Sequence, residues 1–445
     1  MSLKGLIFIG FFSLCVLGAV SMPHLGIYGY LADYCINPAD QWWGRPFAHM
    51  GLRFSFTLAL ATMVGIALQW KKLQFGQSIL YGQELLLLLF LVWVWLLVFI
   101  APGTVGRYGS IDHPSVKLTK IVIFTLMMTH VITDLKKLSG LFWVLSTVGL
   151  ILGVKAWQTP YGRFIGGRLE GIGGADFAEA NFFAAFMAAL LPIIGIQFLR
   201  SKQWLPKFYA LLCGAFTANA VILCRSRGAF LGVAMGAVAA LWFAPRRLRK
   251  QIVILLLIGC AGGLYLTDDF FIERILTITT EQQEMDESAS SRIELWKAGA
   301  KMFVRSPLGI GPGNWYQTIG RYIPEYEGKD SHNTYVKCAA ELGFPGMVLF
   351  VVLIWLAYRA LQRVQAGVSQ PAVAEDYSSF AFALLVALVV ILTCGLTITM
   401  LYTEVVWLLL MLPLCLLRAY DNASVGQPVL MTSGEVTGVP KDAGK

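Results

Sequence analysis

Long apolar runs separated by short polar loops make up most of the chain. Crossing a bilayer takes roughly 20 residues, within a range of about 17–25. Runs close to that length lie at 4–22, 50–70, 79–101, 118–133, 138–157, 180–199, 205–223, 227–244, 251–267, 342–361, 378–397 and 401–418. The pattern predicts an all-α polytopic membrane protein with about 12 transmembrane helices. A further stretch at 24–36 is too short to span, and we expect it to be interfacial or re-entrant.

One polar segment, 268–341, interrupts this pattern between the ninth and tenth runs. It is too long for a simple connection, so we expect it to fold over one membrane face. The predicted organisation is therefore helices 1–9 in 1–267, a loop region in 268–341 and helices 10–12 in 342–418. The remainder, 419–445, is polar and rich in Gly, Ser, Thr and Pro, which is typical of a disordered tail.

Composition supports the membrane assignment. The chain is 57% hydrophobic and only 14% charged, too little charge to cover a soluble protein of this size. The net charge of +9 does not predict a nucleic-acid partner, because the basic residues occupy short loops where topology accounts for them. The eight cysteines lie mostly inside apolar runs and form no CxxC pair, so we expect neither a metal site nor a disulfide framework. Cys35 and Cys338 are the pair that could meet outside the membrane.

The loop charges predict the topology. Alternate loops are strongly basic, and cytoplasmic loops attract Lys and Arg; the basic loops carry Lys71-Lys72, Lys136-Lys137, Arg200 with Lys202 and Lys207, Arg246-Arg247 with Arg249-Lys250, and Arg359 with Arg363. Both termini are then cytoplasmic, and 268–341, with more acids than bases, lies outside. The first run could be a signal peptide with Ala19-Val20-Ser21 near its end, but we expect a retained helix because no soluble domain follows.

The external segment contains a single histidine, His332. Asp330 or Ser331 could cap a short helix whose first turn carries His332, and the helix dipole there favours a neutral imidazole. A neutral imidazole just above a membrane can accept a proton near pH 7. The alternative is that His332 only caps or packs locally.

A helix is predicted earlier in the same segment. Ser291 and Glu294 fit a capping box, and Ile293, Trp296, Ala300 and Phe303 follow at helical spacing over about three turns, until Ser306-Pro307 ends the helix. Arg292 would then sit beside the free N–H groups of the first turn, as in an anion site. It could equally pair with Glu294 or Glu287. Gly309, Gly311 and Gly313 predict a turn where backbone can approach a ligand or the membrane.

Two arginines stand almost inside the membrane. Arg225 and Arg227 lie between two apolar runs with hardly any loop, and parity puts them on the outer side, against the positive-inside bias. We therefore expect them to hold phosphate, although snorkelling to lipid headgroups is the alternative. The loop 158–180, with Arg163 and Arg168, suits a lid or substrate loop. Asn181 follows it and contributes to that loop or simply caps the next helix.

Several of these motifs together resemble the O-antigen ligase / O-antigen polymerase superfamily. They are Ser226-Arg227-Gly228, Arg292 with Trp296, Pro307-Leu308-Gly309-Ile310-Gly311, His332-Asn333-Thr334-Tyr335 and Glu341-Leu342-Gly343-Phe344-Pro345-Gly346. The resemblance covers roughly 175–360. The N-terminal part, with Asn37-Pro38 and Gly44-Arg45-Pro46-Phe47, is similar to a branch of O-glycosylation ligases associated with exosortase systems.

The resemblance implies a bacterial inner-membrane enzyme with its active site facing the periplasm. Such an enzyme takes a glycan from a polyprenyl (undecaprenyl) diphosphate carrier and transfers it to lipid A core, to another carrier-linked glycan or to a protein hydroxyl. It implies no metal or other cofactor, with inversion at the anomeric carbon if attack is a single displacement. Arg227 and Arg292 would hold the diphosphate and His332 would act as the base. The expected substrate-binding residues are Arg225, Asn333, Tyr335, Arg163, Arg168 and Asn181.

Two readings from other classes remain open at this stage. A lipid-linked glycan transporter predicts charged residues at the membrane midplane and little structure outside the membrane, the reverse of what the sequence contains. A non-catalytic subunit of a polysaccharide export machine would make Arg227, Arg292 and His332 dispensable. If the protein is a glycosyltransferase, no local motif distinguishes a ligase from a polymerase.

Overall fold

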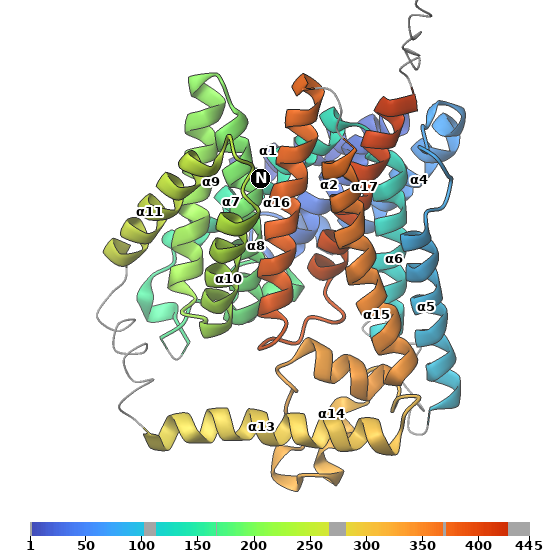
Figure 1. Cartoon of the computed structure of the whole chain (residues 1–445), viewed down its shortest axis with the longest axis vertical. Helices are drawn as coiled ribbons and strands as arrows, with labels where there is room; N and C mark the ends of the chain where they lie inside the picture. The colour runs from blue at the N-terminus through green and yellow to red at the C-terminus, as the bar shows by residue number, and fades with distance from the viewer. Residues whose placement is uncertain (1, 102–112, 166, 267–281, 368–370, 426–445) are drawn as a thin grey trace, which may run out of the picture.

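The computed structural model describes residues 2–101, 113–165, 167–266, 282–367 and 371–425, and within them the chain is all-α (Figure 1). Apart from an isolated bridge between Ile165 and Arg168, these residues form no β-structure. Each expected span coincides with a helix; these helices are α1 (Leu3–Ser21), α4 (Phe54–Gln69), α5 (Gly82–Ile100), α6 (Pro114–Val131), α7 (Leu135–Trp157), α8 (Ala180–Arg200), α9 (Trp204–Leu223), α10 (Arg227–Phe243), α11 (Arg249–Leu266), α15 (Thr334–Ala366), α16 (Pro371–Cys394) and α17 (Glu404–Val425).

Membrane-spanning capacity is not equal among these helices. In the described part of the chain, nine helices are long and apolar enough to cross a bilayer, and α10 is a shorter apolar helix. Helices α6 and α17, which correspond to the runs at 118–133 and 401–418, are not among the nine. The protein is thus a multi-pass, all-α membrane protein, and the count of twelve spans stays a prediction. The stretch at 24–36 forms α2 (Pro23–Ile36), which packs against α1, α4 and α7.

Helices α8 and α16 lie at the centre of the bundle and are the most buried of the candidate spans. Helix α10 packs on α16 through a stripe of glycines at every fourth position, the small-residue pattern that lets membrane helices approach closely. A Cβ on Gly228 would lie 2.1 Å from the Thr397 Oγ1, and one on Gly232 would lie 2.4 Å from the Cys394 Sγ. This close approach brings the start of α10 against the segment that follows α16.

Helix α13 (Gln282–Arg305) lies crosswise over one end of the bundle (Figure 1). It begins before Ser291, so the predicted capping box is wrong: Ser291 lies inside the helix. Its buried face is also shifted from the predicted one, since Leu295, Ala298 and Met302 are buried whereas Ile293 is 49% exposed. The buried side chains form a small core of their own with Ile310, Trp315, Ile319 and Ala340.

Short helices α14 (Trp315–Thr318), η5 (Ile319–Arg321) and η6 (Pro324–Tyr326) complete this outer layer. At the glycine turn, Gly309 packs against backbone, whereas Gly313 lies against the Pro114 side chain. Gly309 has φ +102°, and a Cβ there would lie 2.4 Å from the Glu341 carbonyl oxygen. Helix α15 breaks at Gly343, which has φ +65° and is equally hemmed in by the backbone of 307–309. Two glycines at facing positions thus let two backbones touch where α15 turns into the bundle.

Element boundaries near the C-terminus differ from the prediction in two places. Helix α15 begins at Thr334, so the expected boundary at 341/342 falls inside it, just before the break. Helix α17 continues to Val425, through the first residues of the expected disordered tail. Asp421 explains this: it is buried and accepts a hydrogen bond from the Tyr81 hydroxyl at 2.6 Å. Residues 426–445 lie outside the described part.

Candidate functional site

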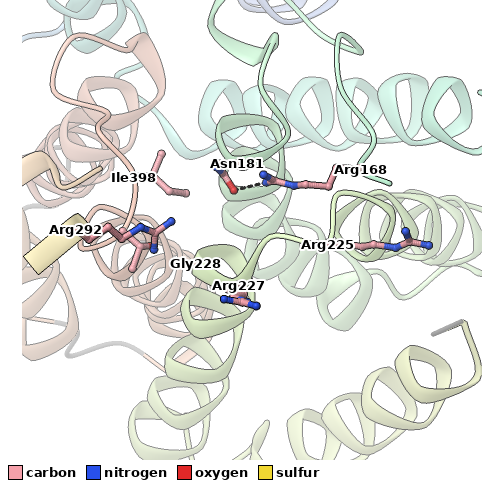
Figure 2. Close-up of a pocket in the computed structure, with 8 residues that line it drawn as sticks. Arg168, Asn181, Arg225, Arg227, Gly228, Arg292 and Ile398 are labelled. Carbon is pink, nitrogen blue, oxygen red and sulfur yellow. Dashed lines mark hydrogen bonds between the residues drawn. The ribbon is translucent and has the colours of Figure 1, made fainter. Parts of the chain in front are cut away.

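A cavity of about 150 Å³ opens at the end of the bundle that α13 covers. Figure 2 shows that its walls come from segments far apart in the sequence. The lining residues are Arg168, Asn181, Arg225, Arg227, Gly228, Arg292, Thr397 and Ile398. The cavity therefore has four arginines around it and no carboxylate among its lining residues. It brings together five of the sequence-predicted site residues.

The turn between α9 and α10 supplies two of these arginines. Ser226 is the N-cap of α10, and its hydroxyl accepts a hydrogen bond from the Ala229 N–H at 3.4 Å. Arg225 takes the left-handed conformation, with φ +48°. Its side chain points away from Arg227 (Figure 2), and its Nη1 donates to the Gly167 carbonyl at 2.5 Å. Arg225 thus links this turn to the loop 158–180. The side chain of Arg227, two residues later, stays exposed.

Asn181 joins two other walls of the cavity. Its Oδ1 accepts hydrogen bonds from the Arg168 Nη2 at 2.5 Å and from the Ser226 Oγ at 2.8 Å. It is not a helix cap, because Glu179 occupies the cap position of α8. Asn181 orients the Arg168 guanidinium at the cavity and fixes the start of α10 beside it.

Arg292 reaches the cavity from α13. It lies inside the helix, so the predicted anion site at a helix start does not exist, and any attraction for anions comes from guanidinium groups. Trp296, one turn on, donates through Nε1 to the Ser331 carbonyl at 3.0 Å and so fastens α13 to the loop before α15. Burial, and then the nearby charges of Arg227 and Arg168, lower the pKa of Arg292. Like charges held this close disfavour one another unless an anion sits between them.

In the part of the chain that the structure describes, Arg227 and Arg292 have no ion-paired carboxylate. A structural arginine near hydrocarbon is normally paired. Two guanidinium groups facing a cavity without a partner carboxylate form a binding site for an anion with several oxygens.

His332 lies beside this site but not in a helix. Helix α15 starts two residues later and is capped by Asn333, so the expected position of His332 in a first turn is wrong. His332 has φ +50°, and its N–H donates to the Asp330 Oδ2 at 3.1 Å. Its side chain is 42% exposed. Burial lowers the pKa of His332, Asp330 raises it, and Arg292 and Lys337 lower it further; the net shift is downward, so the imidazole is neutral at pH 7.

Asn333 and Tyr335 are occupied in holding the structure together. The Asn333 side chain accepts from the N–H groups of Tyr335 and Val336 and donates to the Leu396 carbonyl at 3.0 Å. The Tyr335 hydroxyl donates to the Leu392 carbonyl at 2.8 Å. Both bonds reach the end of α16 and the loop after it, so these residues position His332 and do not face the cavity.

The segment between α16 and α17 is a part of the site that sequence reasoning missed. Thr397 and Ile398 line the cavity, and Thr399 accepts from the Asn333 N–H at 3.1 Å. Thr334 binds the same segment, since its hydroxyl donates to the Ile398 carbonyl at 2.7 Å. Threonines at 397 and 399, within an otherwise apolar region, were the available signal.

Arg163 does not join this group. It lies in η3 (Tyr161–Arg163), is exposed, and is not among the residues that line the cavity. The following part of the expected lid loop is fastened by backbone hydrogen bonds, from Leu169 to Leu223 at 3.3 Å and from Gly174 to Cys35 at 3.1 Å.

A second cavity, of about 310 Å³, is lined in part by neighbours of residues that line the first. It is lined by Pro114, Lys117, Asp176, Ala178, Glu179, Phe182, Gly313, Tyr316, Lys337, Thr399, Tyr402 and Thr403. Within the described residues, no group of three or more His, Cys, Asp or Glu side chains is arranged to hold a metal ion. All eight cysteines, Cys35 and Cys338 included, are free.

Residues 210–351 match the family model described as O-antigen ligase. The match spans His332 and three of the arginines that line the first cavity, Arg225, Arg227 and Arg292. The match supports membership of this chain in the O-antigen ligase superfamily. No curated protein matches the chain. Membership in the superfamily supports a glycan-transferring activity of the O-antigen ligase or polymerase type, with a lipid-linked glycan donor and a glycan acceptor as general substrates.

Proposed function

We propose that this member of the O-antigen ligase superfamily is an inverting glycosyltransferase of the bacterial inner membrane, with its site open to the periplasm. It moves a glycan from a polyprenyl (undecaprenyl) diphosphate carrier to an acceptor hydroxyl, with lipid A core as the acceptor. The observation that carries the proposal is the arginine-lined cavity without carboxylates, beside a histidine whose pKa is lowered.

The arginines supply the electrostatic part of the reaction. When the bond between the anomeric carbon and the diphosphate breaks, the electron pair leaves with the phosphate oxygen. Arg227 and Arg292 face that oxygen's expected position and stabilise the charge as it develops. Arg168, whose guanidinium is held by Asn181, is the third arginine that binds the diphosphate. Because the Arg168 guanidinium is already held by Asn181, it needs little rearrangement during the reaction.

His332 supplies the base. A sugar hydroxyl is a weak nucleophile, and removing its proton during attack contributes typically about 10²–10⁴-fold to the rate. The neutral imidazole takes the hydroxyl proton, the hydroxyl oxygen bonds to the anomeric carbon, and polyprenyl diphosphate departs from the opposite face. The configuration at that carbon inverts. No step in this scheme needs a metal ion.

The test is a transfer assay with purified protein in proteoliposomes. Polyprenyl-diphosphate-linked glycan is supplied with EDTA and, in parallel, with lipid A core, a second equivalent of donor or a candidate acceptor protein. We expect product on lipid A core, and the same rate with and without EDTA.

Other outcomes are equally informative. Product only from two donors would make the protein a polymerase, and product only on protein would make it a protein O-oligosaccharyltransferase. Rate loss in EDTA that Mg²⁺ restores would contradict the metal-independent scheme. Donor that crosses the bilayer without any product would instead identify a lipid-linked glycan transporter.

A further inference from the structure

The second cavity, next to the arginine-lined one, has no part in the scheme above. From its lining and its position we infer that it is a subsite for an uncharged sugar ring, near both the diphosphate cavity and His332. This inference rests on the proposed function, because it assigns a place to one of the sugars that react.

The charges of the second cavity favour a neutral ligand. Lys117 is ion-paired with Asp176, and Lys337 is ion-paired with Asp330 at 3.0 Å. Neither ammonium group is therefore available for a phosphate. Glu179 lines the cavity and is exposed, and among the described residues no cation lies within ion-pair distance of it. A carboxylate without a partner accepts hydrogen bonds from sugar hydroxyls and repels an anion.

The uncharged part of the lining fits the same ligand. The side chains of Tyr316, Tyr402, Thr399 and Thr403 bring hydroxyl groups to the wall, and Phe182 brings an aromatic face. Pockets that combine an apolar or aromatic surface with a few fixed polar groups bind small organic molecules, and their volumes start at about 300 Å³. This cavity of about 310 Å³ therefore has room for a sugar ring.

The same two segments contribute to both cavities. Glu179 and Asn181, at the start of α8, line the second and the first cavity respectively, and the same holds for Thr399 and Ile398 after α16. His332 is within electrostatic range of Arg292 in one lining and of Lys337 in the other. A sugar in the second cavity thus lies near both the diphosphate and the base.

Two sugars could occupy this place, the first sugar of the donor or the terminal sugar of the acceptor. Kinetics with Glu179→Gln and Phe182→Ala separate them. Losing one hydrogen bond to a charged group should raise one KM about tenfold. A rise in donor KM places the donor sugar in the cavity, and a rise in acceptor KM places the acceptor sugar there. Glu325→Gln is the matched control, because Glu325 is exposed in η6 and lines neither cavity.

A binding measurement makes the inference independent of turnover. Ala178 is exposed and lines the second cavity, whereas Ala300 is exposed on α13. Ala178→Cys and Ala300→Cys are each made in a Cys260→Ala background and labelled with a maleimide. Uncharged oligosaccharide released from the donor should slow labelling at 178 but not at 300. Inorganic diphosphate should slow neither.

The outcomes keep the two proposals apart. If wild type transfers glycan but both variants keep the wild-type KM for donor and acceptor, the sugar subsite is wrong and the proposed function stands. If wild type transfers nothing while oligosaccharide still protects 178, the subsite is supported and the proposed function is wrong. Protection of 178 by diphosphate but not by oligosaccharide would make the cavity an anion site and overturn the inference.

Discussion

At the scale of single residues, the arginine cavity is defined by guanidinium groups, and none of the described residues that line it is a carboxylate. Arg227 and Arg292 come from opposite walls, and the pKa of Arg292 is lowered by burial and by its neighbours Arg227 and Arg168. Each of these charges disfavours the empty site and favours a bound diphosphate. Removing one should therefore weaken the reaction without harming the fold.

Arg227→Gln and Arg292→Gln should each lower kcat/KM by about 10²–10³-fold, the usual cost of losing one preorganised donor to a developing charge. Transfer in proteoliposomes measures this. Arg321→Gln, an exposed arginine of the same outer layer, serves as control and should keep wild-type turnover. Equal activity in all three variants would exclude the arginine cavity as the diphosphate site.

The pH dependence of the reaction follows from His332. Its pKa is lowered, so its neutral form persists below its ordinary value of about 6.5, and kcat/KM should fall only when the pH drops below that. Arg292 contributes to the lowering. In Arg292→Gln the acid limb of the residual activity should therefore move to higher pH, whereas in Arg292→Lys it should stay near the wild-type position. An acid limb that does not move in Arg292→Gln would contradict this coupling.

Sequence reasoning reached several of these residues for reasons that the structure corrects. Arg227 stood out because topology did not account for it, and it does line the cavity. Arg292 was singled out through a helix start that does not exist. His332 was placed in a helical turn, but its left-handed backbone and the Asn333 cap put it just before the helix. Residue type and depth in the membrane can be predicted from the local sequence. The backbone conformation of a loop cannot, because it depends on contacts with residues far away in the chain.

At the scale of elements, the site is held by close contacts between helix ends. Asn333 illustrates this, since its side chain both caps α15 and binds the loop after α16. Asn333→Ala should cost about 0.5–2 kcal/mol of stability through the lost cap and should lower kcat by displacing His332. Asn333→Asp, which keeps the cap, should retain more activity at the same donor KM. If the donor KM rises in both variants, Asn333 binds substrate directly.

The glycine stripe on α10 gives a second prediction for an element. A Cβ at Gly232 would meet the Cys394 Sγ at 2.4 Å and the Val390 carbonyl at 3.0 Å, whereas one at Gly259 on α11 would meet nothing within 4 Å. Gly232→Ala should therefore lower the free energy of unfolding by about 1–3 kcal/mol through overpacking. Gly259→Ala should leave it unchanged or raise it slightly. Thermal unfolding in detergent compares the two; equal midpoints would show that α10 and α16 can separate freely.

Helix positions were the most predictable feature at this scale, because apolar runs reflect the bilayer itself. The start of α13 was not predictable in this way, because a Ser-x-x-Glu sequence fits a helix cap but also occurs inside helices. The loop after α16 escaped notice because its threonines acquire a role only when His332 and Arg227 are brought beside it.

At the scale of the whole molecule, the site lies at one end of the bundle, under α13 (Figure 1). The loop charges predict that this end lies outside the cytoplasm. Lys301→Cys on α13 and Arg246→Cys between α10 and α11 test the assignment in a Cys260→Ala background, since Cys260 is exposed. An impermeant maleimide should label position 301 on intact spheroplasts and position 246 only after permeabilisation. The reverse pattern would place the site in the cytoplasm.

The spread of the lining residues along the chain sets the moment at which the site first exists during synthesis. Arg168 and Asn181 leave the ribosome early, but Thr397 and Ile398 follow only after α16. Until α16 has entered the membrane, one wall is missing and His332 lacks the threonine segment that holds its loop. Under the proposed function, a partly made chain therefore cannot yet use the lipid-linked donor, and activity begins only when insertion is almost complete.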